Sequence, residues 1–263
     1  MEDLLISTDF ISLPEGRLFV KYWQHTTLQL APIILFHESL GCVEQWKDFP
    51  QQLLHATGRS VLAYDRIGFG QSTGQTGHVK ADFIFEEALH RIPLLLQRFS
   101  IEKFIAFGHS IGGGFAAGTA IHFPKCQALI LESILAQSDE QMRRSVKVAQ
   151  KLFLQPPYFA RIQRYHAAKA QSVLDAWTQS WLSDVLADWS IVNEIEKIHC
   201  PTLVIHPEKD EFGHVDQAYA IINALKVPHQ LALIAECGHV PHQEYPELVI
   251  QKISSFLKTQ NIA

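Results

Sequence analysis

The stretch that decides the fold reads Phe104-Ile105-Ala106-Phe107-Gly108-His109-Ser110-Ile111-Gly112-Gly113-Gly114-Phe115. Its four leading apolar residues predict a buried strand, and the run after Ser110 predicts a helix. Between them stands Gly-x-Ser-x-Gly, in which two glycines make room for a sharp turn that exposes the serine hydroxyl. The helix N-terminus beneath this serine favours negative charge. Strand, turn and helix together predict that Ser110 is a nucleophile.

A serine hydroxyl is a weak nucleophile until a base takes its proton and a carboxylate orients that base. After a turn of this kind the chain order is serine, acid, histidine. Residues 202–206 predict a strand with Asp210 in the following loop, and residues 230–234 predict the next strand with His239 in its loop. Because parallel strands end at one edge of a sheet, we expect Ser110, Asp210 and His239 to form one catalytic site.

Short apolar runs alternate with helical stretches along most of the chain. Runs that are apolar almost throughout predict strands buried on both faces, and their alternation with helices predicts an α/β sheet. The expected strands are 18–23, 32–36, 60–64, 104–107, 128–131, 202–205 and 230–234. The expected helices are 46–56, 83–99, 113–123, 215–225 and 246–258, the second of them kinked or broken at Pro93.

Residues 135–197 break this alternation, because they contain no convincing strand and are rich in helix formers. One crossover helix needs only about a dozen residues, so we interpret the rest as a helical insertion over the sheet. Pro156-Pro157 predicts its division into two helical parts. Its aromatic residues are favoured as core between insertion and sheet, and the alternative is that some line an apolar substrate pocket. They are Phe153, Tyr158, Phe159, Trp177, Trp181 and Trp189.

Four motifs in this order resemble the α/β-hydrolase superfamily over nearly the whole chain. Besides the serine turn they are Asp65-Arg66-Ile67-Gly68-Phe69-Gly70-Gln71-Ser72, Cys200-Pro201-Thr202-Leu203-Val204-Ile205, and Gly238-His239 followed by Glu244-Tyr245-Pro246. The resemblance implies a mostly parallel eight-stranded sheet with helices on both faces and a helical cap inserted after the sixth strand. It divides the chain into a hydrolase core, residues 1–134 and 198–263, and a cap, residues 135–197.

The resemblance also implies an oxyanion hole made of two backbone N–H groups. One is that of Ile111, and the other is that of Ser39 in the loop His37-Glu38-Ser39-Leu40-Gly41. Glu38 departs from the family, which usually has glycine there. Glycine tolerates backbone angles that glutamate disfavours, and a carboxylate facing the site would oppose the developing oxyanion. We therefore expect the Glu38 side chain to point away from the site, and an inward orientation would weaken the hydrolase interpretation.

Two positions have competing interpretations. Glu132 follows the strand 128–131, where some members of the superfamily carry their acid, so it is the alternative to Asp210. A spacing of four residues relates His206, Asp210 and His214, which could mimic metal ligands on a helix. Pro207 and Gly213 favour a loop there, so no metal site is predicted.

Composition excludes several classes of function. With 22 Lys+Arg against 27 Asp+Glu the net charge is −5, which provides no basic face for nucleic acid or anionic lipid. No phosphate-binding or dinucleotide-binding glycine motif occurs, so we expect no cofactor. The scattered cysteines predict free thiols, and the acidic start Met1-Glu2-Asp3-Leu4 is unlike a secretory signal, so we expect a cytoplasmic location. No run approaches the roughly 20 apolar residues of a membrane span.

The predicted function is that of a cofactor-independent serine hydrolase. It would cleave a small or medium, largely apolar ester or lactone through an acyl-enzyme, with a small molecule as its partner. Ser110 argues against haloalkane dehalogenase and epoxide hydrolase, whose nucleophile at this position is aspartate. The alternatives are a C–C bond hydrolase of ring-cleavage products, a non-hydrolytic lyase, and a non-catalytic binding or receptor protein on the same fold. The oligomeric state stays open.

Overall fold

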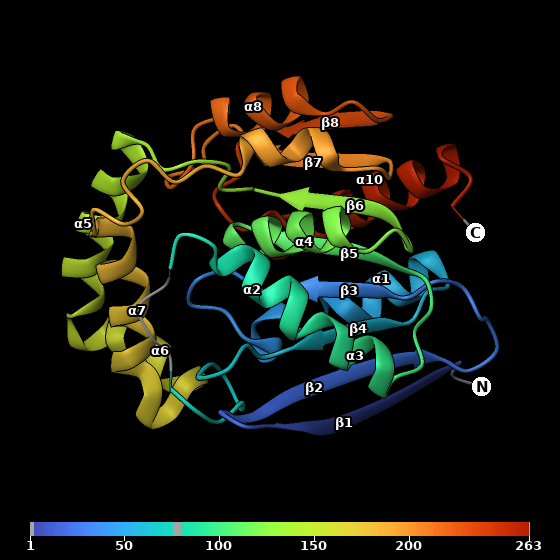
Figure 1. Ribbon diagram of the computed structural model, residues 1–263, viewed down its shortest axis with the longest axis horizontal. Coiled ribbons are helices and arrows are strands. Elements are labelled where there is room, and N and C mark those ends of the chain that lie inside the picture. The colour runs from blue at the N-terminus through green and yellow to red at the C-terminus, as the bar shows by residue number, and fades with distance from the viewer. Residues whose placement is uncertain (1–2, 76–79, 263) are drawn as a thin grey trace.

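A twisted sheet of eight strands runs through the computed structural model, which describes residues 3–75 and 80–262 (Figure 1). Met1 and Glu2 of the acidic start lie outside the described residues. The strand order is β1-β2-β4-β3-β5-β6-β7-β8, antiparallel at β1–β2 and β2–β4 and parallel elsewhere. The mostly parallel eight-stranded sheet is therefore confirmed. Its strands are β1 Leu4–Leu13, β2 Gly16–His25, β3 Ile33–Phe36, β4 Val61–Tyr64, β5 Phe104–His109, β6 Cys126–Glu132, β7 Thr202–Pro207 and β8 His229–Ile234.

Burial explains which strands the residue pattern could identify. Strands β3, β4, β5 and β7 are buried at every position, which matches the apolar residues that make up most of each strand. Strand β1 was not expected from the pattern, because it carries Ser7-Thr8-Asp9 at its centre and most of its residues are exposed. It lies at the edge of the sheet and pairs only with β2, so a polar sequence is compatible with a strand there.

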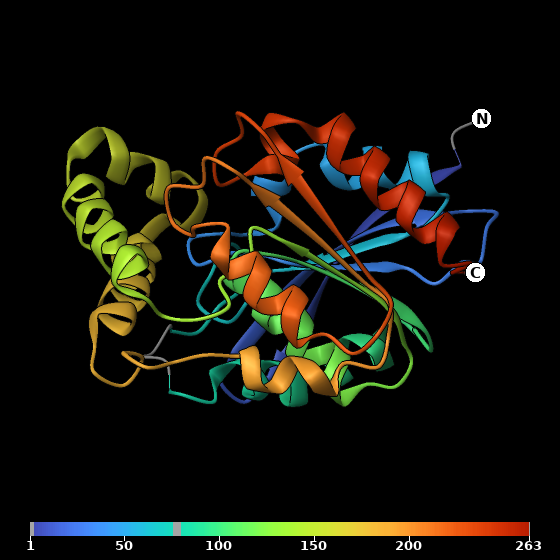
Figure 2. The ribbon, with the colours of Figure 1, turned by 90° about the horizontal axis from the view of Figure 1, so that it is seen from above.

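Helices cover both faces of the sheet (Figure 2). The helices α1 and α10 pack on one face, and α2, α3, α4 and α8 pack on the other. The sheet separates two apolar clusters, one under each helical layer. The bounds are α1 Phe49–Thr57, α2 Phe83–His90, α3 Ile92–Arg98, α4 Ile111–His122, α8 Asp216–Ala224, α9 Pro241–Glu244 and α10 Pro246–Thr259, with short 3₁₀ turns η1 Val43–Trp46 and η3 Val192–Lys197.

The helices expected from the sequence are present, and two of them differ from the expectation or need comment. The expected break at Pro93 is confirmed, since α2 ends at His90 and Pro93 occupies the first turn of α3. Proline fits the first turn of a helix because its missing N–H has no partner to lose there. The helix expected over 46–56 begins only at Phe49, after the 3₁₀ turn η1. The short helix α9 was not expected. No helix in the described part of the chain is both long and apolar enough to cross a membrane.

Three helices, α5 Glu140–Phe153, α6 Pro156–His166 and α7 Ala170–Leu182, lie between β6 and β7. We call them the cap helices. They stand beyond the ends of the parallel strands, on the left of Figure 1. The chain divides at Pro156 as expected, but the expectation of two helical parts was wrong, because the 3₁₀ turn η2 (Ala167–Lys169) separates α6 from α7. The exact division into core and cap stays a prediction.

The two ends of the inserted segment lie side by side. Gln137 and Ser190 form an isolated antiparallel bridge. The buried side chain of Gln217, on α8, accepts the N–H groups of Ala136 and Gln137 at 2.8 and 3.0 Å and donates to the carbonyl of Gln137 at 3.1 Å. The segment that leads into the cap helices is therefore paired with the segment that leads out of them, and it is also bonded to α8.

Candidate active site

Ser110 lies in the turn between β5 and α4, at a backbone φ of 56° that residues other than glycine rarely adopt. The turn depends on its two glycines. A Cβ on Gly108 would lie 2.1 Å from the carbonyl oxygen of Gly112, and a Cβ on Gly112 would lie 2.1 Å from that of Phe36. No side chain fits at either position. Backbone strain of this kind collects at functional sites, and here it holds the Ser110 side chain at the N-terminus of α4.

The structure brings Asp210 and His239 together at the ends of β7 and β8. His239 Nδ1 lies 2.8 and 2.9 Å from the two carboxylate oxygens of Asp210. Asp210 Oδ1 also accepts the N–H groups of Phe212 and Gly213, at 2.8 and 3.0 Å, which fixes the carboxylate in its loop. Because the carboxylate accepts a hydrogen bond from Nδ1–H, the Nε2 atom of a neutral His239 carries no proton and can act as a base.

Asp210 and His239 each shift the pKa of the other towards the charged form. Burial alone would lower the pKa of His239, but the hydrogen bond and the charge of Asp210, with weaker contributions from Glu211 and Glu38, raise it above its usual value. Burial would also raise the pKa of Asp210, yet the hydrogen bond and charge of His239 and the loop N–H groups lower it. The site therefore stabilises an ionised Asp210 beside a protonated His239, the state that a general base reaches after taking a proton.

Glu132, the alternative acid, has another partner. His242 Nδ1 donates to Glu132 Oε2 at 2.5 Å, and both side chains are buried. His109 lies between the two histidine–carboxylate pairs and donates through Nε2 to the carbonyl of His239 at 2.8 Å. Among the described residues, His109, Glu132 and His242 offer possible metal-ligand atoms within 4.8 Å of one another. The hydrogen bond between His242 and Glu132 already engages two of the three side chains.

The loop 37–41, which we call the oxyanion loop, holds Ser39 beside the serine turn. Within the described chain, the N–H groups of Ser39 and Ile111 donate to no other protein group. Ile111 is the first residue of α4, where helical N–H groups have no partner in the helix. Ser39 and Ser110 line one cavity, and Ser39 and Ile111 line a second cavity next to it. The two donors predicted from the sequence are thus near Ser110 and available.

Glu38 folds back over its own loop. Its Oε2 lies so close to Gly41 that a Cβ built on that glycine would be only 2.2 Å from this oxygen. The same oxygen is buried without a hydrogen-bond partner. Burial raises the pKa of Glu38 to about 7, against the opposing charges of Arg66, His239 and His242. The residue still lines the cavity that holds Ser110, and its charge acts on His239. The expectation that Glu38 points away from the site is therefore only half right.

The raised pKa of Glu38 leads us to expect an unusual pH dependence of kcat/KM. Above pH 7 its carboxylate ionises, which raises the pKa of His239 and would oppose the negative charge of an oxyanion held by the N–H groups of Ser39 and Ile111. Below pH 6 it is protonated and resembles glutamine. Glu38→Gln should therefore raise kcat/KM about tenfold at pH 8, shift the acid limb to lower pH, and match the unmodified protein near pH 5.5. The measurement is the pH profile of ester hydrolysis.

Glu211→Gln is the matched control, because Glu211 also raises the pKa of His239 but accepts the N–H of His239 rather than lying in the oxyanion loop. It should shift the acid limb without increasing the rate at pH 8. Equal alkaline rates in Glu38→Gln and the unmodified protein would show that the Glu38 charge does not reach the oxyanion.

An apolar cavity of about 210 Å³ contains Ser110 and His239. The cap helices form one wall of it, and the remaining walls come from the sheet edge. The cap side chains are Met142, Val146, Phe153, Trp177 and Trp181, and the others include Ile134, Leu135, Phe212 and Val240. Both interpretations of the inserted aromatics therefore apply to different residues: Trp189 is core, whereas Phe153 and Trp177 line the cavity. The helical spacing of Met142, Val146 and Phe153 could have identified α5 as a wall.

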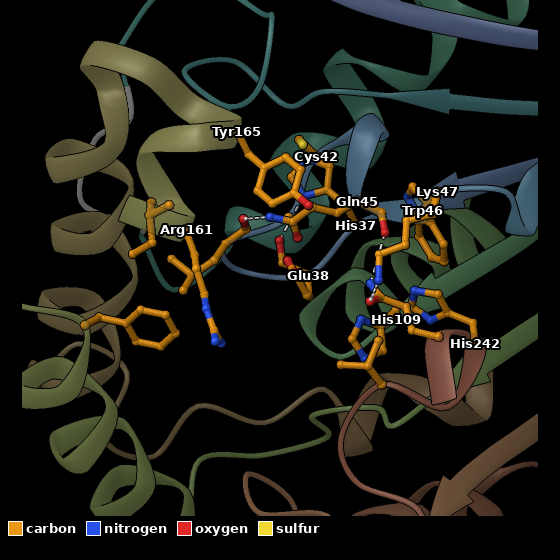
Figure 3. Close-up of a pocket in the computed structure, with 16 residues that line it drawn as sticks. His37, Glu38, Cys42, Gln45, Trp46, Lys47, His109, Arg161, Tyr165 and His242 are labelled. Carbon is orange, nitrogen blue, oxygen red and sulfur yellow. Dashed lines mark hydrogen bonds between the residues drawn. The ribbon is translucent and has the colours of Figure 1, made fainter. Parts of the chain in front are cut away.

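A further cavity of about 450 Å³, separate from the one that Ile111 lines, adjoins the apolar cavity at Glu38, Leu40 and Val240 (Figure 3). Helix α6 supplies Arg161 and Tyr165 on one side and the oxyanion loop supplies Glu38 on the other, with His109 and His242 at the far end. Unlike the first cavity, it is lined by many polar side chains. Together the two cavities provide an apolar chamber at the nucleophile and a polar chamber beside it.

Comparisons with known proteins agree with this architecture. Among solved structures, a bacterial membrane phospholipase A superposes with a TM-score of 0.77 at 20% identity, covering 98% of this chain and 87% of that one. Proline iminopeptidase from Mycobacterium smegmatis gives 0.69 at 20% identity, covering 97% and 98%. A thermophilic esterase from Thermogutta terrifontis gives 0.70 at 19% identity, covering 97% and 99%. These likenesses show the α/β-hydrolase fold.

Curated relatives match over a shorter stretch. The 1-acylglycerol-3-phosphate O-acyltransferase ABHD5 of Mus musculus is 26% identical over 109 residues, which is 41% of this chain and 30% of that protein. The chain thus spans about a third of the length of the curated relatives it matches. Residues 31–246, most of the chain, match the family described as serine aminopeptidase, S33. The chain therefore belongs to the S33 serine aminopeptidase family of α/β hydrolases.

Proposed function

We propose that this protein is a serine hydrolase that cleaves a small or medium, largely apolar ester or lactone through an acyl-enzyme. The observation that carries the proposal is one apolar cavity holding both Ser110, on its strained turn, and His239, whose Nδ1 is held by Asp210. Nucleophilic catalysis requires a serine and a histidine base that face the same substrate-sized space, with a carboxylate to orient the histidine.

In the proposed reaction, His239 Nε2 takes the Ser110 proton as Ser110 Oγ attacks the substrate carbonyl. Asp210 stabilises the imidazolium, and the N–H groups of Ser39 and Ile111 hold the oxyanion. His239 then protonates the leaving group, and water releases the acyl product by the reverse sequence. No hydrogen bond joins the Ser110 and His239 side chains among the described residues, so this contact forms in the proposal only with substrate bound.

Cavity chemistry supports the substrate class. The chamber at Ser110 is walled by apolar and aromatic side chains, which suits an apolar acyl group, whereas the polar chamber suits a leaving group that hydrogen-bonds. Names of relatives include an aminopeptidase, an esterase and a phospholipase. A panel of p-nitrophenyl esters, lactones and aminoacyl arylamides separates these substrates, and we expect turnover of the first two.

A fluorophosphonate tests the nucleophile without knowledge of the substrate. We expect a stoichiometric adduct on Ser110, located by peptide mass spectrometry, absent in Ser110→Ala and formed much more slowly in His239→Ala. A folded protein that takes no adduct, cleaves nothing in the panel and is nevertheless thermally stabilised by ligands would favour the binding or receptor alternative. Turnover restricted to vinylogous diketones would favour the C–C bond hydrolase.

A further inference from the structure

His166, the last residue of α6, is a cap residue that is completely buried. Both of its ring nitrogens bond to backbone groups outside the cap helices. Nδ1 accepts the N–H of Gly70 at 2.9 Å, and Nε2 donates to the carbonyl of Leu40 at 2.8 Å. Because a carbonyl can only accept, the proton must be on Nε2 and the lone pair on Nδ1. The two contacts together define a neutral imidazole in one tautomer.

These two contacts reach different loops of the core. Gly70 belongs to the loop that follows β4, and Leu40 belongs to the oxyanion loop. Leu40 directly follows Ser39, whose N–H is one of the two oxyanion donors in the proposed function. Core groups also hold the oxyanion loop: Gln45 Nε2 donates to the same Leu40 carbonyl at 3.1 Å, and the Glu38 carbonyl accepts the Gly41 N–H at 3.1 Å and the Arg66 guanidinium at 3.0 Å. From the cap side, His166 supplies a hydrogen bond to this loop, and the Leu40 side chain packs against the cap residues Ile162, Ala170 and Leu174.

We propose that His166 is a positioning residue for the oxyanion hole: through the Leu40 carbonyl it holds the oxyanion loop so that the Ser39 N–H faces the carbonyl attacked by Ser110. This inference rests on the proposed function. A shift of α6 would then also move the Ser39 N–H, so the geometry of the oxyanion hole would depend on the position of that helix. A displacement of about 1 Å in a catalytic group can cost on the order of 100-fold in rate, so this tie has consequences for turnover.

Lys169, three residues further on, provides the matched control. It is also at the junction between cap and core, and its Nζ donates to the carbonyls of Phe69, Gly70 and Ser72. It therefore holds the cap helices to the loop after β4 but makes none of these contacts with the oxyanion loop. Lys169→Met removes a cap-to-core tie of similar extent while leaving the Leu40 carbonyl in place.

The experiment compares kcat, KM and Tm in four variants on an ester that the unmodified protein cleaves. His166→Ala should lower kcat about 10- to 100-fold with KM changed less than about threefold, because the oxyanion forms only in the transition state. His166→Gln places an amide N–H near the position of Nε2 and should recover most of this loss. His166→Asn reaches only as far as Nδ1 and should stay as slow as His166→Ala. Lys169→Met should lower Tm and keep kcat.

Two results would overturn the proposal. One is a loss of kcat that follows the loss of Tm equally in His166→Ala and Lys169→Met. The other is His166→Gln performing no better than His166→Asn. Either result would make His166 a structural contact of the cap alone.

A second readout does not depend on turnover. Amide hydrogen exchange of residues 37–41 should accelerate in His166→Ala and not in Lys169→Met, measured with the complete chain carrying Ser110→Ala. If the unmodified protein neither cleaves an ester nor takes a fluorophosphonate, the proposed function fails, and accelerated exchange would still support the tie. Unchanged exchange in His166→Ala overturns the tie whatever the activity.

Discussion

Replacing Ser110 with alanine is expected to lower kcat for ester hydrolysis by about 10⁶-fold, the size of loss known when a triad serine is removed. The reason is that, among the described residues that line the cavity, no other hydroxyl lies on a strained turn directly before a helix N-terminus. Residual catalysis would come from the oxyanion donors and from binding, which do not need the nucleophile. Single-turnover kinetics with a chromogenic ester measure the loss.

Ser133 is the control for this experiment. It lines the same cavity, its backbone φ of 48° is also positive, and its Oγ is buried without a partner. Unlike Ser110, Ser133 does not stand directly before a helix, and no histidine–carboxylate pair is assigned to it. Ser133→Ala should therefore stay within about threefold of the unmodified protein. The opposite pattern, a large loss at Ser133 and a small one at Ser110, would reassign the nucleophile.

Asp210→Asn is expected to lower kcat by about 10⁴-fold with little change in fold. An asparagine can offer an N–H to His239 Nδ1, which would then move the imidazole proton to Nε2. In that tautomer Nε2 cannot take the Ser110 proton, so the base is lost although the geometry remains. The measurement is kcat for ester hydrolysis, with circular dichroism to show that the fold is retained.

Glu132→Gln makes the same chemical change at the alternative acid. Because Glu132 is paired with His242 rather than His239, we expect less than a tenfold loss of kcat. A loss of about 10⁴-fold at Glu132 together with a small loss at Asp210 would mean that Glu132, at the end of β6, orients the base, and would contradict the assignment made from the geometry.

The fold was predictable where the determinants are local. The apolar run 104–107, the glycines at 108 and 112 and the proline at 93 each specify the conformation of their own neighbourhood. Strand β1 was not predictable in the same way, because an exposed edge strand needs no apolar sequence and is defined by its pairing with β2.

In the candidate site, too, the residues that could be predicted are those with local signals in the sequence. Chain order was enough to select Ser110, Asp210 and His239, since each follows a strand whose end reaches the same edge of the sheet. The pairing of His242 with Glu132 joins residues 110 positions apart, and that of His166 with Leu40 joins residues 126 positions apart. No local pattern contains such contacts. The position of Glu38 was evident from the sequence as a departure from glycine, but the fold of its side chain over Gly41 depends on packing.

The bridge between Gln137 and Ser190 holds together the two ends of the segment that joins β6 to β7. Once two ends are held together, the entropic cost of the chain between them rises by only about 0.6 kcal/mol for each doubling of its length. A change in the length of residues 138–189 therefore costs little loop-closure entropy, while the bridge keeps the entry and the exit of the segment together. Loop-closure entropy thus sets no sharp limit on the size of the segment that stands beyond the sheet edge.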